Sequence, residues 1–213
     1  MHDWRVRAPA ITVSRAEGAF LLAAVAAVLL WSGIAPTDRL TWFMEVIWVV
    51  VGVPLIVALR GRYDFTRLLL WLIAIHSVIL IYGGKYTYAE TPLGDWFAAQ
   101  FELARNHYDR LGHFAQGFIP AILARELLLR QTPLRPGGWL FYLVCAACLS
   151  FSAFFEFIEW WVALILGGDA DAYLATQGDI WDTHWDMFLA LCGAILAQLL
   201  FARRHDRQLG VAA

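Results

Sequence analysis

The sequence is poor in charged residues, which make up only 16% of its 213 residues, whereas hydrophobic residues make up 61%. Its mean hydropathy is +0.59. An average soluble domain has about 25% charged residues, so this composition excludes an ordinary soluble fold. The apolar runs are as long as membrane spans. We therefore expect a polytopic membrane protein in which every span is a helix.

Cysteine is also scarce, with three residues that all lie inside the apolar runs. Their position excludes a framework of loop disulfides, and Cys145 and Cys148 lack the soluble surroundings of a redox motif. The net charge of −2 offers no support for nucleic-acid binding. A cleavable signal peptide is not evident, because the first apolar run lacks a small-residue cleavage site, so we expect this run to be retained.

Six apolar runs have lengths near the roughly 20 residues that a helix needs to cross a bilayer. They cover residues 18–35, 41–59, 68–83, 111–129, 138–166 and 183–202. Residues 92–106 follow Thr91 and begin with Pro92, and their apolar positions recur at helical spacing, which predicts a short helix in the membrane interface. The predicted fold is all-α: one integral membrane domain over residues 1–213, with a bundle of six transmembrane helices and an interfacial helix on the outer side.

Arginines are concentrated at the two termini and in the even-numbered connections. The basic groups are Arg5, Arg7 and Arg15; Arg60, Arg62 and Arg67; Arg125, Arg130 and Arg135; and Arg203, Arg204 and Arg207. Cytoplasmic loops carry an excess of such residues, so both termini are expected in the cytoplasm of a bacterium, with the chain in its inner membrane. The fourth run is the weakest, but omitting it would place the third basic group and the C-terminal tail on the face opposite the first two basic groups.

Acidic residues and one histidine interrupt the runs at a single depth near the predicted outer face. Residues three or four apart on a helix share a face, so these residues form three pairs. An ionised group at the centre of a bilayer is unfavourable by roughly 2.5 to 3.5 kcal/mol on insertion scales, so several at one depth need a common explanation. We interpret them as a candidate catalytic site made of Asp109, His113, Glu156, Glu159, Asp182 and Asp186.

Each of these residues also has a simpler interpretation. Asp182 is placed to cap the last helix, and Asp109 is placed to pair with Arg110. His113 alone is typical of a hydrogen-bonded interior histidine. Capping cannot explain the deeper acids Glu156, Glu159 and Asp186, which require protons, a metal ion or a nearby arginine.

Two mechanisms would neutralise the acids. In the first, His113, Glu156, Glu159 and Asp186 bind a divalent metal ion such as magnesium, manganese, calcium or zinc. In the second, crowded carboxyl groups carry protons, as in membrane proton relays. Three functions follow: an enzyme acting on a lipid or lipid-linked envelope substrate, a proton-coupled transporter or flippase, and a non-catalytic envelope protein whose polar cluster fastens its helices. Membrane lipids are the expected partners.

The segments that carry the candidate site resemble a known family. Residues 108–114 read Tyr-Asp-Arg-Leu-Gly-His-Phe, and residues 178–188 read Gly-Asp-Ile-Trp-Asp-Thr-His-Trp-Asp-Met-Phe. Together with Glu156, Glu159 and Gly193, they are similar to YjdF-type bacterial inner-membrane proteins over most of the chain beyond Ser14. A looser similarity is to VanZ-like membrane proteins, which often have glutamine and asparagine where Glu159 and Asp186 stand. The resemblance implies an envelope-facing membrane protein and brings no defined reaction with it.

Overall fold

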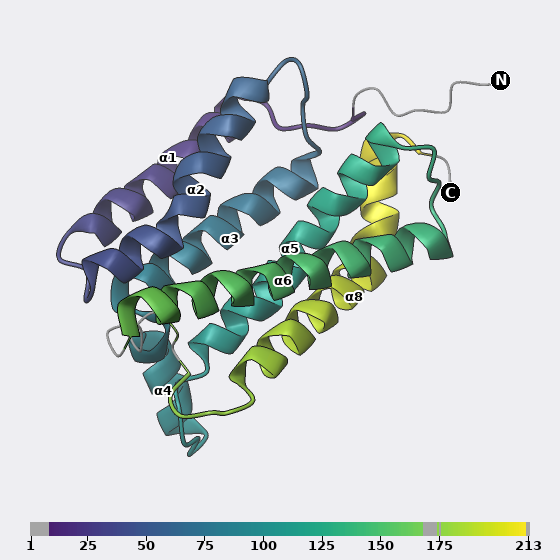
Figure 1. Cartoon of the computed structure of the whole chain (residues 1–213). Coiled ribbons are helices and arrows are strands. Elements are labelled where there is room, and N and C mark those ends of the chain that lie inside the picture. The colour runs from purple at the N-terminus through teal and green to yellow at the C-terminus, as the bar shows by residue number, and fades with distance from the viewer. Residues whose placement is uncertain (1–8, 168–173, 175, 212–213) are drawn as a thin grey trace.

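The computed structural model describes residues 9–167, 174 and 176–211, and their regular structure is entirely helical. Two short helices, η1 (Tyr88–Glu90) and α4 (Pro92–Gln100), lie between the third and fourth long helices (Figure 1). The long helices are α1 (Arg15–Gly33), α2 (Arg39–Leu59), α3 (Arg67–Tyr86), α5 (Tyr108–Gln131), α6 (Gly138–Leu166) and α8 (Asp182–Leu209).

Five of the long helices, α1, α2, α3, α6 and α8, are long and apolar enough to cross a membrane. The chain is therefore a helical, polytopic membrane protein. Helix α5 is as long, with 24 residues, but carries Arg125, Glu126 and Arg130. Six crossings therefore remain our prediction. The predicted interfacial helix is represented by α4, which ends at Gln100 and not at residue 106; its position at an interface also remains a prediction.

Successive long helices run in opposite directions (Figure 1). One end of the bundle carries the acids of the candidate site, and the other carries most of the arginines. We call the end at which α5 and α8 begin the acidic end, and the end at which they finish the basic end. At the acidic end, the turn after α1 meets the end of α3 through Thr37 N–H, which donates to the Lys85 carbonyl at 2.9 Å. At the basic end, Ile11 N–H donates to the Gln208 carbonyl at 3.1 Å.

Helix α5 lies inside the bundle, in contact with α3, α6 and α8. It approaches α8 closely because a Cβ atom at Gly117 would overlap the backbone of Ala190, and one at Gly193 would overlap the backbone of Phe114. Small residues allow such backbone contact between membrane helices. These glycines therefore fix α5 against α8 one turn from His113.

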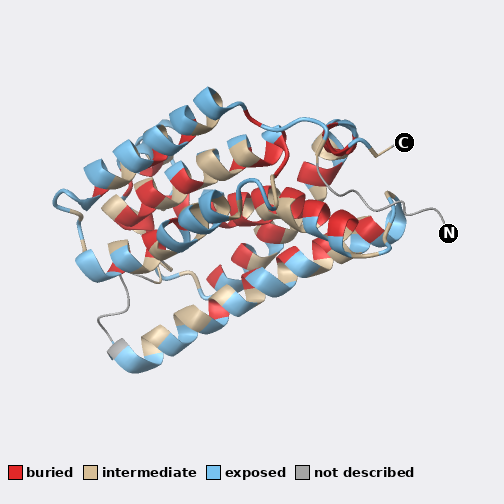
Figure 2. Cartoon of the chain, turned by 90° about the horizontal axis from the view of Figure 1, so that it is seen from above, coloured by how far each residue is buried: buried red, intermediate tan, exposed pale blue. Residues whose placement is uncertain are grey.

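Buried residues face the interior of the bundle, and exposed residues cover its outside (Figure 2). Many of the exposed side chains are large and apolar, as expected for surfaces that contact lipid chains. Examples are Phe20 and Leu30 on α1 and Val51 and Leu55 on α2. The interior is consequently the place where polar groups can gather.

Candidate functional site

The candidate site is centred on His113, which lies on α5 one turn after Asp109. The His113 Nε2 atom lies 3.6 Å from Asp109 Oδ1 and 3.9 Å from Asp186 Oδ2 on α8. The other ring nitrogen, Nδ1, lies 3.8 Å from Glu156 Oε1 on α6. Three helices therefore place carboxylates around one imidazole. We call these four residues the His113 cluster.

Every member of the His113 cluster is buried, with exposed fractions of 6% for Asp109, 4% for His113, 6% for Glu156 and 2% for Asp186. One atom of each residue has no hydrogen-bond partner in the described part of the chain: Asp109 Oδ2, His113 Nδ1, Glu156 Oε1 and Asp186 Oδ1. Buried polar atoms are nearly always paired, and one left unpaired is unfavourable by roughly 1–3 kcal/mol. The cluster thus has unused capacity to bind an ion or protons.

The geometry around His113 Nε2 suits a metal ion. One candidate ligand atom each from Asp109, His113 and Asp186 lies within 4.8 Å of the others. Two ligands of one ion can be no further apart than twice the bond length, roughly 4 to 5 Å for bonds of about 2.0 to 2.6 Å. Glu156 faces the opposite ring nitrogen, where a carboxylate can orient a ligating histidine.

The residues grouped in this way differ from the predicted ligand set of His113, Glu156, Glu159 and Asp186. The structure brings Asp109 to Nε2 in place of the two glutamates. Glu159, one turn beyond Glu156 on α6, is half-buried and lines a neighbouring cavity.

Asp182 is buried at the start of α8 and, unlike the acids of the His113 cluster, forms an ion pair with an arginine. Its Oδ1 accepts a hydrogen bond from Arg105 Nη1 at 2.9 Å. Asp179 interacts with the same arginine at 3.3 Å and with Arg110 at 2.6 Å. The structure therefore pairs Arg110 with Asp179, not with Asp109, and Asp182 makes no capping hydrogen bond at the start of α8.

These ion pairs join the two nearby arginines to acids outside the His113 cluster. Among the described residues, Arg105 pairs with Asp179 and Asp182, and Arg110 pairs with Asp179. The three acids of the cluster face a histidine, which can supply at most one positive charge. A surplus of negative charge at buried positions must be neutralised, because burial of an uncompensated charge is strongly unfavourable.

A cavity of about 200 Å³ adjoins the cluster between α2, α3, α5 and α6. Polar residues line its acidic end, and apolar residues line its deeper part. The polar set is Glu45, Tyr88, Asp109, His113 and Glu159, with Gln116 and His76 further in. The apolar set includes Trp48, Val49, Val53, Ile56, Leu123 and Phe151.

Tyr88 is a site residue that the sequence did not reveal. Its ring is buried against Gly83 and Gly112, where any Cβ atom would collide with it. Burial raises the pKa of the Tyr88 phenol well above its usual value, and the Glu45 carboxylate raises it further. Tyr88 therefore remains protonated beside Glu45, which is itself buried.

A second buried polar cluster lies at the basic end. Glu126, which is not exposed at all, accepts hydrogen bonds from Thr66 Oγ1 at 2.7 Å and Arg130 Nη1 at 3.1 Å, and lies 3.1 Å from His205 Nε2. Arg125 pairs with Asp206 at 2.5 Å. We call Thr66, Glu126, Arg130 and His205 the Glu126 cluster. Unlike the His113 cluster, it has a donor for each carboxylate oxygen.

Comparison with known proteins agrees with the resemblance noted above. The chain is 48% identical over 182 residues to the inner membrane protein YjdF of Escherichia coli (strain K12), with 85% of this chain and 87% of that protein covered. The similarity to VanZ-like proteins is supported by neither comparison, and no solved structure matches the chain. Residues 18–207 match the family described as "Predicted membrane protein (DUF2238)". The chain therefore belongs to this family of bacterial inner-membrane proteins.

Proposed function

We propose that Asp109, His113 and Asp186 bind a divalent metal ion and that the site acts on a lipid or lipid-linked substrate of the cell envelope. One observation carries the proposal: three ligand atoms from α5 and α8 lie within 4.8 Å of one another, on buried side chains that leave polar atoms unpaired. A divalent ion would neutralise the surplus charge of the cluster and satisfy these atoms.

The reaction class we propose is hydrolysis or transfer at a phosphoryl or acyl group. A bound divalent ion supplies Lewis acidity at the oxygen of such a group. Glu156 Oε1 lies 3.8 Å from His113 Nδ1, where it would orient the ring once Nε2 binds the ion. Glu159 and Glu45 lie in the adjoining cavity, where a carboxyl group can accept or donate a proton. Arg105 and Arg110 form ion pairs with Asp182 and Asp179 at the same end of the bundle.

The site is proposed to face the outside of the inner membrane. The basic end carries arginines at the ends of α2, α5 and α8, and such residues favour the cytoplasmic side. The acidic end then faces outward with the His113 cluster. A lipid-linked envelope substrate in the outer leaflet would reach the cluster directly.

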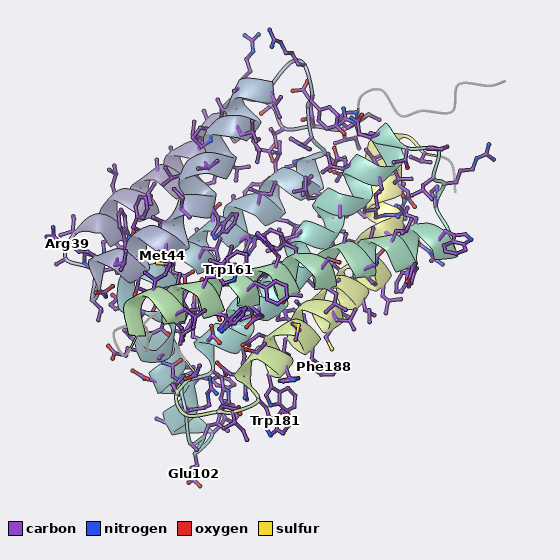
Figure 3. All side chains as sticks on the ribbon, in the orientation of Figure 1. Arg39, Met44, Glu102, Trp161, Trp181 and Phe188 are labelled. Carbon is purple, nitrogen blue, oxygen red and sulfur yellow. The ribbon has the colours of Figure 1, made fainter. Side chains whose placement is uncertain are left out.

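Elemental analysis of detergent-purified protein tests the proposal. We expect about one divalent ion per chain in the wild type and loss of most of it in Asp186→Asn and His113→Gln. Glu102→Gln is the control, because Glu102 is exposed at the tip next to α4 and loses the same charge (Figure 3).

A thermal-shift titration provides a test that does not depend on variants. A ligand at 100 times its dissociation constant stabilises the folded state by about 2.7 kcal/mol. Wild type stripped with a chelator should therefore regain thermal stability when zinc or manganese is added. If the wild type contains no divalent ion and no added ion stabilises it, the proposal is overturned. The acids would then carry protons or connect the helices.

A further inference from the structure

The cavity beside the His113 cluster changes from polar to apolar along its length. Its acidic end is lined by ionisable groups and its deeper walls by aliphatic and aromatic side chains. Ligand cavities of this kind place a few polar groups to orient one part of the ligand and apolar surface to enclose the rest. The matching ligand is an amphiphile.

A second cavity, of about 100 Å³, continues along α2 toward the basic end. Three residues, Val53, Ile56 and Ile73, line both cavities. The lining residues on α2 run from Glu45 in the first cavity to Arg60 in the second, which is about 22 Å at 1.5 Å per residue. This length approaches the roughly 30 Å thickness of the hydrocarbon core. We call the two cavities together the chain slot.

In a bilayer, the hydrocarbon chains of lipids are available to fill an apolar slot. Apolar cavities do not hold water. An unfilled cavity loses dispersion contacts along its walls. The solvent around membrane helices is hydrocarbon chain, which is as apolar as the side chains that line the slot.

One side of the slot lies between α2 and α6, whose aromatic side chains line the first cavity. Trp48 on α2 spans this side, with its ring centroid 5.9 Å from that of Phe151 and 6.3 Å from that of Phe155 on α6. Aromatic contacts of this kind are worth only about 0.5–1.5 kcal/mol, so the rings can separate. A chain can therefore enter sideways from the bilayer.

We infer that the substrate of the His113 cluster is an amphiphile of which one hydrocarbon chain lies in the chain slot, with its headgroup at the cluster. The part of this inference that concerns the headgroup rests on the proposed function. The chain runs from the acidic end along α2 toward Arg60. The length and straightness of the hydrocarbon chain determine which lipids fit the slot. Transfer from the bilayer to the slot gives no hydrophobic gain, because both are apolar.

Gly52 allows the slot to be closed without touching the cluster. It lines the first cavity, and no atom lies within 4 Å of a Cβ atom added there. Gly52→Phe therefore introduces a ring into the chain path. Val51→Phe is the matched control, because Val51 is 58% exposed on the outside of the same helix and does not line the slot.

The test uses phosphatidylglycerol and phosphatidylethanolamine carrying a photoactivatable diazirine in one acyl chain, in vesicles that contain the full-length protein. Crosslinked peptides are identified by mass spectrometry. We expect labelling of slot residues on α2, α3, α5 and α6 beside the first cavity and on α1, α2 and α3 beside the second, in the wild type and in Val51→Phe, with at least about a fivefold loss in Gly52→Phe. A difference between the two lipids would show which headgroup the cluster prefers.

Metal analysis of the same samples separates this inference from the proposed function. Gly52→Phe should retain the ion while it loses slot labelling. Equal labelling in Gly52→Phe and Val51→Phe, or labelling confined to outward faces, would overturn the chain slot even if the ion is present. Slot labelling without any ion would retain the slot and overturn the metal site. Gly52→Leu gives the same comparison with a smaller side chain.

Discussion

His205 Nε2 on α8 lies 3.1 Å from Glu126 Oε2 on α5, and neither side chain is exposed. Thr66 at the start of α3 donates to the same oxygen. The Glu126 cluster therefore joins three helices at the basic end through one carboxylate whose partners are all present. The His113 cluster at the opposite end has more acids than partners. This difference separates a structural polar cluster from a candidate site.

Glu126→Ala should destabilise the protein strongly. Removing one member of a buried ion pair typically lowers the free energy of unfolding by about 3–5 kcal/mol, because the remaining groups stay buried without their partner. Thermal or denaturant unfolding in detergent measures the effect. Glu90→Ala, at an exposed acid, should change stability by no more than about 0.5 kcal/mol. If Glu126→Ala and Glu90→Ala behave alike, the cluster has no structural role.

The Glu126 and His205 side chains should also be energetically coupled. A double-mutant cycle with Glu126→Ala and His205→Ala should give an interaction energy between about 0.5 and 3 kcal/mol, as expected for residues in one network. Additive effects would show that the two side chains act independently.

The close contact between α5 and α8 should tolerate no side chain at Gly117. Gly117→Ala places a methyl group on the backbone of Ala190, which cannot move aside as a flexible side chain could. We expect a loss of roughly 1–3 kcal/mol of stability, as for overpacked cores, together with weaker metal binding. Gly52→Ala is the control, since its Cβ atom meets open space and the change raises helix propensity. Equal melting temperatures would contradict the close contact.

Protonation of His107 should lower the stability of the protein at mildly acidic pH. Burial lowers the pKa of His107 below its usual value near 6.5, and the charges of Arg110 and Arg105 lower it further. A lowered pKa in the folded state gives stability that is present above pH 6.5 and lost as pH falls through that value toward the folded pKa. The melting temperature of His107→Gln should therefore fall less than that of the wild type between pH 7.5 and 5. Parallel pH profiles would exclude this residue as the cause.

The six-crossing topology places Gln131 and Arg204 on the same side of the membrane, opposite Glu102. Cysteine substitutions at these exposed positions can be treated with a membrane-impermeant maleimide in intact cells. We expect labelling of Glu102→Cys only, with the other two labelled after cell lysis. Labelling of all three cysteine variants in intact cells would show that α5 does not cross, because Gln131 and Arg204 would then lie on the same side as Glu102.

The sequence predicted the parts of the molecule that depend on one helix at a time. The apolar runs overlap the long helices, and Asp109 and His113 share a face because four residues make about one turn. The pairing of Asp182 with Arg105 depends on how two connecting segments fold over the acidic end, which no periodicity specifies. The Glu126 cluster likewise required the start of α3 to meet the last turns of α5 and α8. In the sequence, Arg130 of this cluster resembled any other arginine of a cytoplasmic connection.

The cavity was hidden for a related reason. Glu45 faces the cavity because of how α2 is rotated against α3, and the sequence does not specify that rotation. Tyr88 turns inward only because Gly83 and Gly112 leave room for its ring. These are properties of three segments packed together.

Helix α2 differs from its neighbours in how firmly it is held. It packs mainly against α3, and Pro54, five residues before the end of the helix, cannot donate a backbone hydrogen bond to the preceding turn. A helix that is attached along one flank and interrupted by a proline in its second half yields more readily than α5 and α8, whose backbones touch. We therefore expect lipid molecules to enter the chain slot past α2, which bends at Pro54. A crosslink between positions 48 and 151 should block this entry.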